Sequence, residues 1–415
     1  MRNSLPFRFC IHRGAHEIGG NCIELRADGK TLLLDLGMPL SVSSTADVPL
    51  PEVSGLADNK DNNFLGVVLS HPHADHYGLL SKAAAGTRVY LGQDAQRLLK
   101  AAQPFTTFAL ALPNASTYRD RLTFEVGPFR VTPFLIDHSA FDAYSLLIEA
   151  GGRKLFYSGD FRGHGRKHAA FKRLLTEPSI KGVDVLLLEG THLGKDSHAI
   201  AQTEDALEDD ITQSISRTSG LVLACFSGQN IDRFVTFWKA ARRAGRIFVA
   251  DAYLAHILDA LNRPSLPRPP VFLPAKMKSK LIREKNTSVV IPFRRRRIYP
   301  EQIAERASNL VLMFRSSMIE EFESLDCLDG GKLIYSQWPG YIDRDRMNIK
   351  EWCASHNLNF EIQHTSGHAD IQTLVTLAQA VSANRVIPIH SDAPERSCEL
   401  IPNAKAIDDG EWIDI

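Results

Sequence analysis

Short apolar runs alternate along the chain with amphipathic segments, and this alternation predicts the secondary structure. Apolar runs bounded by turns indicate buried strands, whereas apolar positions three or four residues apart indicate helices. Strands are expected at 31–35, 66–70, 131–136, 154–158, 184–189, 221–226, 246–250, 309–314, 332–336, 359–364 and 386–390. Helices are expected at 92–103, 204–217, 231–244, 301–307 and 370–381. Strands alternating with helices are typical of an α/β protein.

A dense group of metal-type ligands follows the strand expected at 66–70. Within six positions the chain carries His71, His73, Asp75 and His76. The turn after the strand would direct His71 and His73 to one side and Asp75 and His76 to the other. A single loop could therefore serve two metal ions.

The residue types of this segment fit a hydrolytic metal centre. Imidazole nitrogens and carboxylate oxygens suit a borderline ion such as zinc, and a catalytic site keeps one position open for water. Two ions about 3.5–4 Å apart can share a hydroxide that attacks phosphorus or a carbonyl carbon. Metal-dependent hydrolysis is therefore the expected chemistry.

Three further candidate ligands each follow an expected strand. His138 comes after 131–136, Asp160 after 154–158, and His390 at the end of 386–390. Gly159, directly before Asp160, permits a close approach of backbone to the metal. The order of these residues makes them the expected remainder of the ligand set.

Together with these residues, two earlier segments carry a resemblance to a known family. The segments 14–21 and 31–37 resemble an opening hairpin and first motif, and the ligand loop, His138 and Asp160 match the next motifs in order. By these residues the chain is similar to metallo-β-lactamase-fold hydrolases of the β-CASP nuclease group, above all to ribonuclease J. The resemblance implies an αββα sandwich with an inserted α/β cap. It also makes Asp35 a carboxylate that steadies the ligand loop rather than a ligand.

The second half of the chain carries the motifs that distinguish this group. The matching segments are 189–192, 203–204, 226–233, 365–369 and 388–390. The resemblance implies that His368 protonates the leaving oxygen and that Glu204 orients the His368 ring. The substrate-binding residues implied by these motifs are Ser227, Asn230, Arg233, Ser366, Gly367 and His368.

The same resemblance implies a two-zinc phosphodiesterase. His71, His73 and His138 would hold one ion, Asp75, His76 and His390 would hold the other, and Asp160 would bridge them. A hydroxide between the ions would attack the phosphorus and leave a 5′ phosphate. Manganese or iron(II) are alternatives to zinc, because histidine and carboxylate ligands do not select one ion. The expected substrate is RNA, with single-stranded DNA as the alternative.

Several positions depart from the pattern of ribonuclease J. His192 stands where an aromatic residue is usual, and Asp370 follows the Gly-His-Ala step where ribonuclease J tends to carry serine. Ser391 and Asp392 replace its usual Gly-Glu. These departures concern the preference for a 5′ monophosphate rather than the metal site. The resemblance ends near residue 413, which implies that the extra C-terminal domain of ribonuclease J is missing.

Length and motif order predict an insertion. At 415 residues and 44% hydrophobic composition, two domains are expected. The first would comprise 1–203 and 351–415, and the cap would comprise 204–350. Substrate would bind between the two.

The charge pattern is informative only locally. The chain has 48 basic and 48 acidic residues, so net charge gives no argument for nucleic acid. Arg294, Arg295, Arg296 and Arg297 are adjacent in the expected cap and could neutralise phosphates. The alternative is a solvated loop compensated by acids such as Glu301 and Glu305. Both interpretations stay open.

Cysteine usage and hydropathy predict the environment of the chain. Six cysteines are scattered without a Cys-x-x-Cys pair, which favours free thiols in a reducing cytoplasm. No segment approaches the roughly 20 apolar residues that cross a bilayer. A cytoplasmic protein is therefore expected. Its oligomeric state stays open, although relatives of the ribonuclease J type are often homodimers.

Two other function classes compete with the nuclease. A small-molecule hydrolase that cleaves an ester, lactone or thioester could use the same metal centre, but this reading gives the long cap and His368 no purpose. A catalytically silent nucleic-acid-binding subunit would ordinarily have lost metal ligands, and here every expected position is filled.

Overall fold

The chain forms two compact units, the second inserted into the first. The computed structural model describes residues 6–42, 44–106, 110, 112, 114–194, 201–342 and 348–415. The first unit comprises 1–100, 110–201 and 367–415, and the second comprises 101–109 and 202–366. The chain therefore passes between the units near residues 201 and 367.

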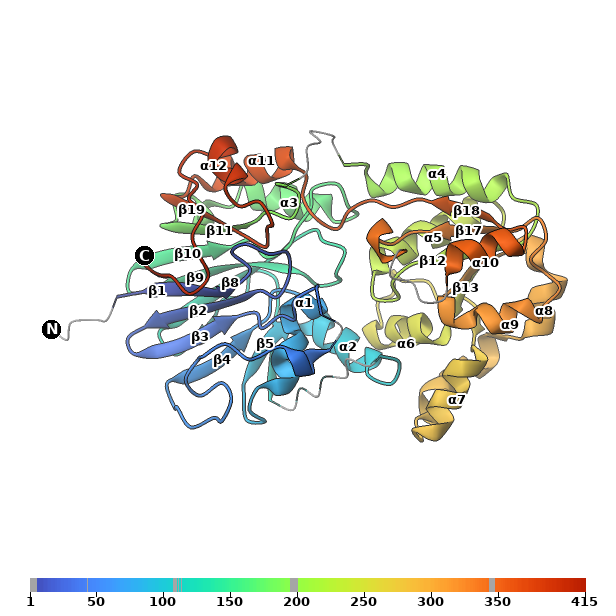
Figure 1. Ribbon diagram of the computed structural model, residues 1–415, viewed down its shortest axis with the longest axis horizontal. Coiled ribbons are helices and arrows are strands. Elements are labelled where there is room, and N and C mark those ends of the chain that lie inside the picture. The colour runs from blue at the N-terminus through green and yellow to red at the C-terminus, as the bar shows by residue number, and fades with distance from the viewer. Residues whose placement is uncertain are drawn as a thin grey trace. The chain divides into compact units, whose positions relative to one another are not determined.

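The first unit contains two sheets that face each other (Figure 1). One sheet has the order β20 (Trp412–Asp414), β1 (Arg8–Arg13), β2 (Cys22–Ala27), β3 (Lys30–Leu34), β4 (Phe64–Val68), β5 (Val89–Gly92) and β6 (Ala115–Tyr118). The other has the order β19 (Arg385–Ile389), β11 (Val185–Glu189), β10 (Arg153–Tyr157), β9 (Tyr144–Ala150), β8 (Phe129–Leu135) and β7 (Phe124–Val126). Each sheet combines parallel and antiparallel pairs.

Helices cover both outer faces of this sandwich. They are α1 (Ala74–Tyr77), α2 (Gln93–Ala102), α3 (His168–Leu175), α11 (Ile371–Val381) and α12 (Arg396–Leu400). One buried cluster, which includes Phe9 and Leu146, lies between the sheets. A second cluster joins β11 to α3 and α11, and a third joins β4 and β5 to α2. The layers are therefore helix, sheet, sheet, helix, which confirms the predicted sandwich.

The second unit has one parallel sheet. Its order is β15 (Arg297–Ile298), β14 (Val271–Phe272), β13 (Ile247–Asp251), β16 (Leu310–Met313), β12 (Val222–Cys225), β17 (Lys332–Tyr335) and β18 (Asn359–Ile362). The helices are α4 (Glu204–Ser216), α5 (Ile231–Arg243), α6 (Ala252–Leu261), α7 (Ala275–Arg283), α8 (Pro300–Glu305), α9 (Ile319–Glu323) and α10 (Ile349–Ser355). A long 3-10 segment, η4 (Thr287–Arg296), joins α7 to β15. The sheet is fully parallel because a helical crossover separates most consecutive strands.

Aromatic side chains fill both faces of this parallel sheet. The Phe226 ring stacks on Phe237 of α5, with centroids 5.1 Å apart. In another buried cluster, the Phe314 ring stacks on Trp352 of α10 at 5.2 Å. Because α10 and β18 belong to this unit, the chain returns to the first unit later than the expected residue 351. Periodicity alone does not show with which sheet a strand pairs.

Candidate metal centre

Adjacent strand ends bring the predicted ligands of the first unit together. β10 is parallel to β11, and β11 is parallel to β19. The carboxyl ends of these strands therefore meet at one edge of the sheet. Asp160 follows β10 and His390 follows β19. On the facing sheet, β3 and β4 are also parallel, which places Asp35 beside the start of the ligand loop.

Seven predicted ligands form two groups, each with ligand atoms within 4.8 Å of one another. The first group is His71, His73 and His138, and the second is Asp75, His76, Asp160 and His390. Asp160 also lies near the first group, because its Oδ2 is 3.7 Å from His71 Nε2. The division of the ligand loop between two groups is the one that its turn suggests.

The two groups differ in electrostatics. Burial holds the pKa of His71 and that of His138 well below the ordinary value, and it lowers the pKa of His73 to about 4. Burial opposes protonation of His76 as well, but the carboxylates of Asp160 and Asp35 hold its pKa well above the ordinary value. The first group is therefore neutral near pH 7, whereas the second combines imidazoles with carboxylates.

The donor set fits divalent cations. His71 Nε2, Asp160 Oδ1 and His390 Nε2 are buried, and none has a hydrogen-bond partner within the described part of the chain. A buried polar atom without a partner is costly in a native structure. Neutral imidazoles and carboxylates are also the ligands that zinc, manganese and iron(II) accept. Each group could hold one such ion.

Asp35 makes four hydrogen-bond contacts, three with the segment that carries the ligand loop and one with Tyr157 of β10. Its Oδ1 accepts from the Ser70 backbone at 2.7 Å, and its Oδ2 lies 2.7 Å from Ser70 Oγ. The same Oδ2 lies 2.8 Å from His76 Nδ1 and 2.8 Å from the Tyr157 hydroxyl. With Nδ1 donating to Asp35, Nε2 of His76 is the nitrogen that would bind a metal, which would displace the proton held there.

A second chain of hydrogen bonds reaches His390. The Asn21 side chain donates to the Tyr157 hydroxyl at 3.1 Å, and its Oδ1 lies 3.0 Å from His390 Nδ1. The Tyr157 hydroxyl in turn donates to Asp35. His76 and His390, on opposite sheets, are therefore linked through Asp35, Tyr157 and Asn21. Neither Asn21 nor Tyr157 was predicted to have this role, because a tyrosine that ends an apolar run resembles an ordinary core residue.

His368 lies beside the second group and contacts two side chains of the 189–192 motif. Its Nδ1 is 3.3 Å from Glu189 Oε2 and 3.0 Å from Thr191 Oγ1. Burial lowers the pKa of His368, but Glu189 outweighs it and raises this pKa to about 9. The ring is protonated at neutral pH while its side chain stays 21% exposed. Glu189 was predicted only as part of the 189–192 motif, without a role of its own. A carboxylate that ends an apolar strand is a sequence signal for a functional residue.

Backbone geometry at the centre is unusual in two respects. Asp35 and His390 have positive φ values of 58° and 57°, a conformation that costs free energy for non-glycine residues and is concentrated at functional sites. Gly159 also has a positive φ, and a Cβ there would lie 2.8 Å from the carbonyl oxygen of Tyr144. The fold therefore requires glycine directly before Asp160.

Glu204 and Arg233 form a buried pair in the second unit. Glu204 begins α4, and its two oxygens accept from Arg233 Nη2 at 3.0 Å and Thr236 Oγ1 at 2.8 Å. The Arg233 side chain is fully buried and also donates to the carbonyl oxygens of Ser336 and Thr365. The predicted orientation of His368 by Glu204, and substrate contact by Arg233, stay predictions.

The other predicted substrate-binding residues have different settings. Ser227 is exposed after β12, and Asn230 caps α5 by accepting from the Arg233 backbone. Ser366 lies next to Gly367, whose carbonyl oxygen is 2.6 Å from His138 Nδ1. That contact directs His138 Nε2 toward the first group.

The four adjacent arginines, residues 294–297, differ in their ion-pair partners. Arg296 pairs with Asp259, and Arg294, Arg295 and Arg297 form no ion pair with any described residue. The compensation by Glu301 or Glu305 that the alternative interpretation invoked is absent among the described ion pairs.

The fold and the two ligand groups define a metallo-β-lactamase-type centre. Residues 54–215 match the family described as "Beta-lactamase superfamily domain". This match and the curated relatives described below are consistent with assignment of the chain to the metallo-β-lactamase-fold nucleases of the β-CASP group. The predicted fold class and family resemblance are thereby confirmed.

Curated relatives include two kinds of ribonuclease. The chain is 23% identical over 223 residues to "Ribonuclease J" of Sinorhizobium meliloti, covering 51% of this chain and 38% of that protein. It is 27% identical over 241 residues to "Endoribonuclease YSH1" of Gibberella zeae, covering 52% of this chain and 27% of that protein. The chain thus matches well under half the length of either relative.

A solved structure shares the whole fold. "Crystal Structure of a Protein of Unknown Function from Enterococcus faecalis V583" matches with a TM-score of 0.80 and 18% identity, covering 99% of this chain and 100% of that one. This likeness concerns the fold alone. Among the described residues, no helix has the length and apolar character to pass through a bilayer.

Proposed function

We propose that this chain is a metal-dependent phosphodiesterase that hydrolyses RNA and leaves a 5′ phosphate. The observation that carries the proposal is the position of His368, an imidazole hydrogen-bonded to Glu189 and Thr191 beside two groups of metal ligands. Relatives named as ribonucleases support RNA as the substrate. Zinc is the proposed ion, and manganese and iron(II) are the alternatives to be tested.

Some residues of the site would hold metal ions, and another would transfer a proton. His71, His73 and His138 would hold one ion, and the Asp75 group would hold the other. Bound divalent cations lower the pKa of water and neutralise charge on phosphate oxygens. The chain itself fixes their ligands through Asp35 and the carbonyl oxygen of Gly367.

His368 would supply the proton to the departing oxygen. Because its Nδ1 contacts Glu189 and Thr191, the proton on Nε2 is the one available for transfer. A protonated imidazole carries both protons, and general acids of this kind contribute roughly 10²–10⁴-fold to rate. Glu189, buried and hydrogen-bonded to the Phe161 and Ala369 backbones, fixes the ring.

Cleavage of end-labelled RNA tests the function. Purified protein is incubated with RNA and single-stranded DNA of equal length, with chelator or with zinc, manganese or iron(II). We expect metal-dependent RNA products bearing 5′ phosphates, and none with chelator. Intact RNA under every metal condition, with turnover of a model ester, would instead establish a small-molecule hydrolase.

The variant His368→Ala tests the proposed acid. We expect both ions to remain bound, as measured by metal analysis after dialysis, while kcat falls by roughly 10²–10⁴-fold. Retention of metal separates loss of the acid from loss of the centre. A variant with full turnover would exclude His368 as the proton donor.

A further inference from the structure

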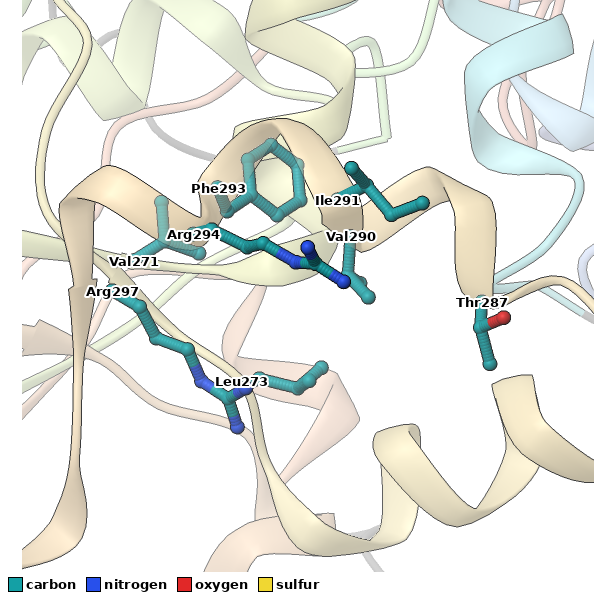
Figure 2. Close-up of a pocket in the computed structure, with 8 residues that line it drawn as sticks. All are labelled: Val271, Leu273, Thr287, Val290, Ile291, Phe293, Arg294 and Arg297. Atoms are coloured by element: carbon teal, nitrogen blue, oxygen red, sulfur yellow. The ribbon is translucent and has the colours of Figure 1, made fainter.

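A small pocket in the second unit has apolar walls and two cationic side chains. It lies where β14, η4 and β15 meet and has a volume of about 230 Å³. Its apolar lining consists of Val271, Leu273, Val290, Ile291 and Phe293. Figure 2 shows these side chains together with Arg294, which extends toward Val290, and Arg297, which points toward Leu273.

The size of the pocket limits what it can hold. Pockets for drug-sized ligands have volumes of roughly 300–1,000 Å³, and this one is smaller. It accommodates a flat group the size of one nucleobase. Phe293 is 2% exposed and gives the pocket a rigid aromatic wall, while Ile291, 51% exposed, lies at its rim. The apolar surface therefore lines a concave site rather than a broad patch.

The arginines of the pocket lack acidic partners. Arg294 is exposed, and neither it nor Arg297 forms an ion pair with a described residue. Nε of Arg297 is buried without a hydrogen-bond partner in the described part of the chain. The neighbouring Arg296 differs, since it pairs with Asp259 and donates to the carbonyl oxygen of Pro269. Two uncompensated guanidinium groups beside apolar walls favour an anion with an apolar body.

The surrounding segment strengthens this preference for an anion. Residues 275–297 contain nine lysines and arginines and one acidic residue, Glu284, in a chain whose net charge is zero. Lys276 pairs with Glu320, and most of the other cations have no described acidic partner. Local positive charge of this density attracts a polyanion.

We propose that this pocket binds one nucleotide of single-stranded RNA, with the base against the apolar side chains of Val290 and Ile291 and the adjoining phosphates on Arg294 and Arg297. The site lies outside the metal centre, and the proposal rests on RNA being the substrate. Sites for single-stranded nucleic acid combine cations that follow the phosphate backbone with side chains that cover the bases. An anionic lipid surface would instead call for a continuous exposed apolar face, and here the apolar groups line a cavity.

Binding measurements without catalysis test the proposal. Chelator-treated protein is titrated into fluorescent single-stranded RNA at several salt concentrations. Arg294→Gln with Arg297→Gln should weaken binding about ten-fold and reduce the salt slope by roughly 0.7 per lost phosphate. The matched control, Lys278→Gln with Arg283→Gln, removes two exposed charges of the same segment outside the pocket and should weaken binding less. Equal losses in both pairs would overturn the pocket in favour of diffuse charge.

A filled pocket and an abasic probe test the base. The wild-type chain should bind ordinary RNA several-fold more tightly than an abasic strand of equal length. Val290→Trp, which keeps every charge, should abolish this difference, and a preserved difference would overturn the proposal. The proposal would also be overturned if the wild-type chain bound phosphatidylserine vesicles and Arg294→Gln abolished that binding without changing RNA binding. Cleavage of a short oligonucleotide tests the metal centre separately. RNA that binds without being cleaved would refute the proposed function but not the binding of RNA at this pocket.

Discussion

At the residue scale, hydrogen bonds that lead away from the centre fix the direction of its imidazoles. His76 contacts Asp35, His138 contacts the Gly367 carbonyl oxygen, and His390 contacts Asn21, each through Nδ1. Each contact leaves Nε2 for a metal. Such partners commonly contribute 10–100-fold to metal affinity, so the residues behind the ligands are as testable as the ligands.

Tyr157 offers the clearest test of this network. Tyr157→Phe removes the hydroxyl that joins Asp35 to Asn21, and we expect the affinity of the second metal group to fall about 10-fold or more. Competition with a chromophoric chelator measures this affinity. Tyr144→Phe is the matched control, because that buried hydroxyl donates to Asp142 instead. Equal affinities in the two variants would show that the network does not tune the metal.

Glu189 controls the pH range in which His368 can act as an acid. A general acid must be protonated, so kcat should fall as the pH rises through the His368 pKa of about 9. Glu189→Gln removes the carboxylate that raises this pKa. We therefore expect the variant to lose activity at a lower pH, toward the ordinary histidine value of about 6.5. Superimposable pH–rate profiles would refute the coupling.

The sequence predicted the ligands better than their supports. Histidines and aspartates that follow apolar runs are conspicuous, and the structure gathers all seven. Asn21 and Tyr157 act through contacts with residues more than 100 positions away in the chain. Hydrogen bonds over such separations depend on which strands become neighbours, and periodicity does not contain this information.

At the element scale, helix α11 begins at Ile371, shortly after His368, and the side chain of Asp370 caps its N-terminus. Asp370 Oδ1 accepts from the Thr373 backbone at 2.8 Å, and Oδ2 accepts from the Ala201 backbone at 3.1 Å. The residue that departs from ribonuclease J at this position is therefore a helix cap. Serine, the usual residue there, can fill the same role.

Asp370→Ala should destabilise the first unit by about 0.5–2 kcal/mol, whereas Asp370→Ser should cost less. Burial opposes ionisation, but hydrogen bonds from Thr373 lower the pKa of Asp370 below its ordinary value. The stabilisation is thus present above about pH 4 and is lost as pH falls through the lower folded pKa. Urea unfolding of the three proteins at pH 7 and pH 3 measures both effects. A difference that persists unchanged at pH 3 would contradict this account.

The elements expected from periodicity are present, but others were missed, among them the long strand β9 and helix α6 and the short strand β14. Every strand and helix expected from periodicity has a counterpart in the structure. β14 lies in the proline-rich segment 264–274 and consists of only two residues, Val271 and Phe272. Such a strand exists because β13 and β15 flank it, which is a tertiary effect.

At the scale of the whole molecule, the metal ligands all belong to one of the two units. Metal should therefore stabilise the first unit without a direct effect on the second. A ligand at 100 times its Kd adds about 2.7 kcal/mol to stability. We expect scanning calorimetry to show two transitions, of which one moves to lower temperature with chelator. Two transitions that move equally would show that the units unfold together.

The discontinuity of the first unit also sets an order of events for a chain leaving the ribosome. Strand β1 pairs with β20, and β11 pairs with β19. Until the last of these strands has been translated, both sheets present open edges, which are prone to pair with other chains. At about 5–20 residues per second, His390 emerges roughly 10–40 s after residue 201. During that interval the nascent protein lacks His390, so the second group of ligands is incomplete and the proposed hydrolysis cannot begin.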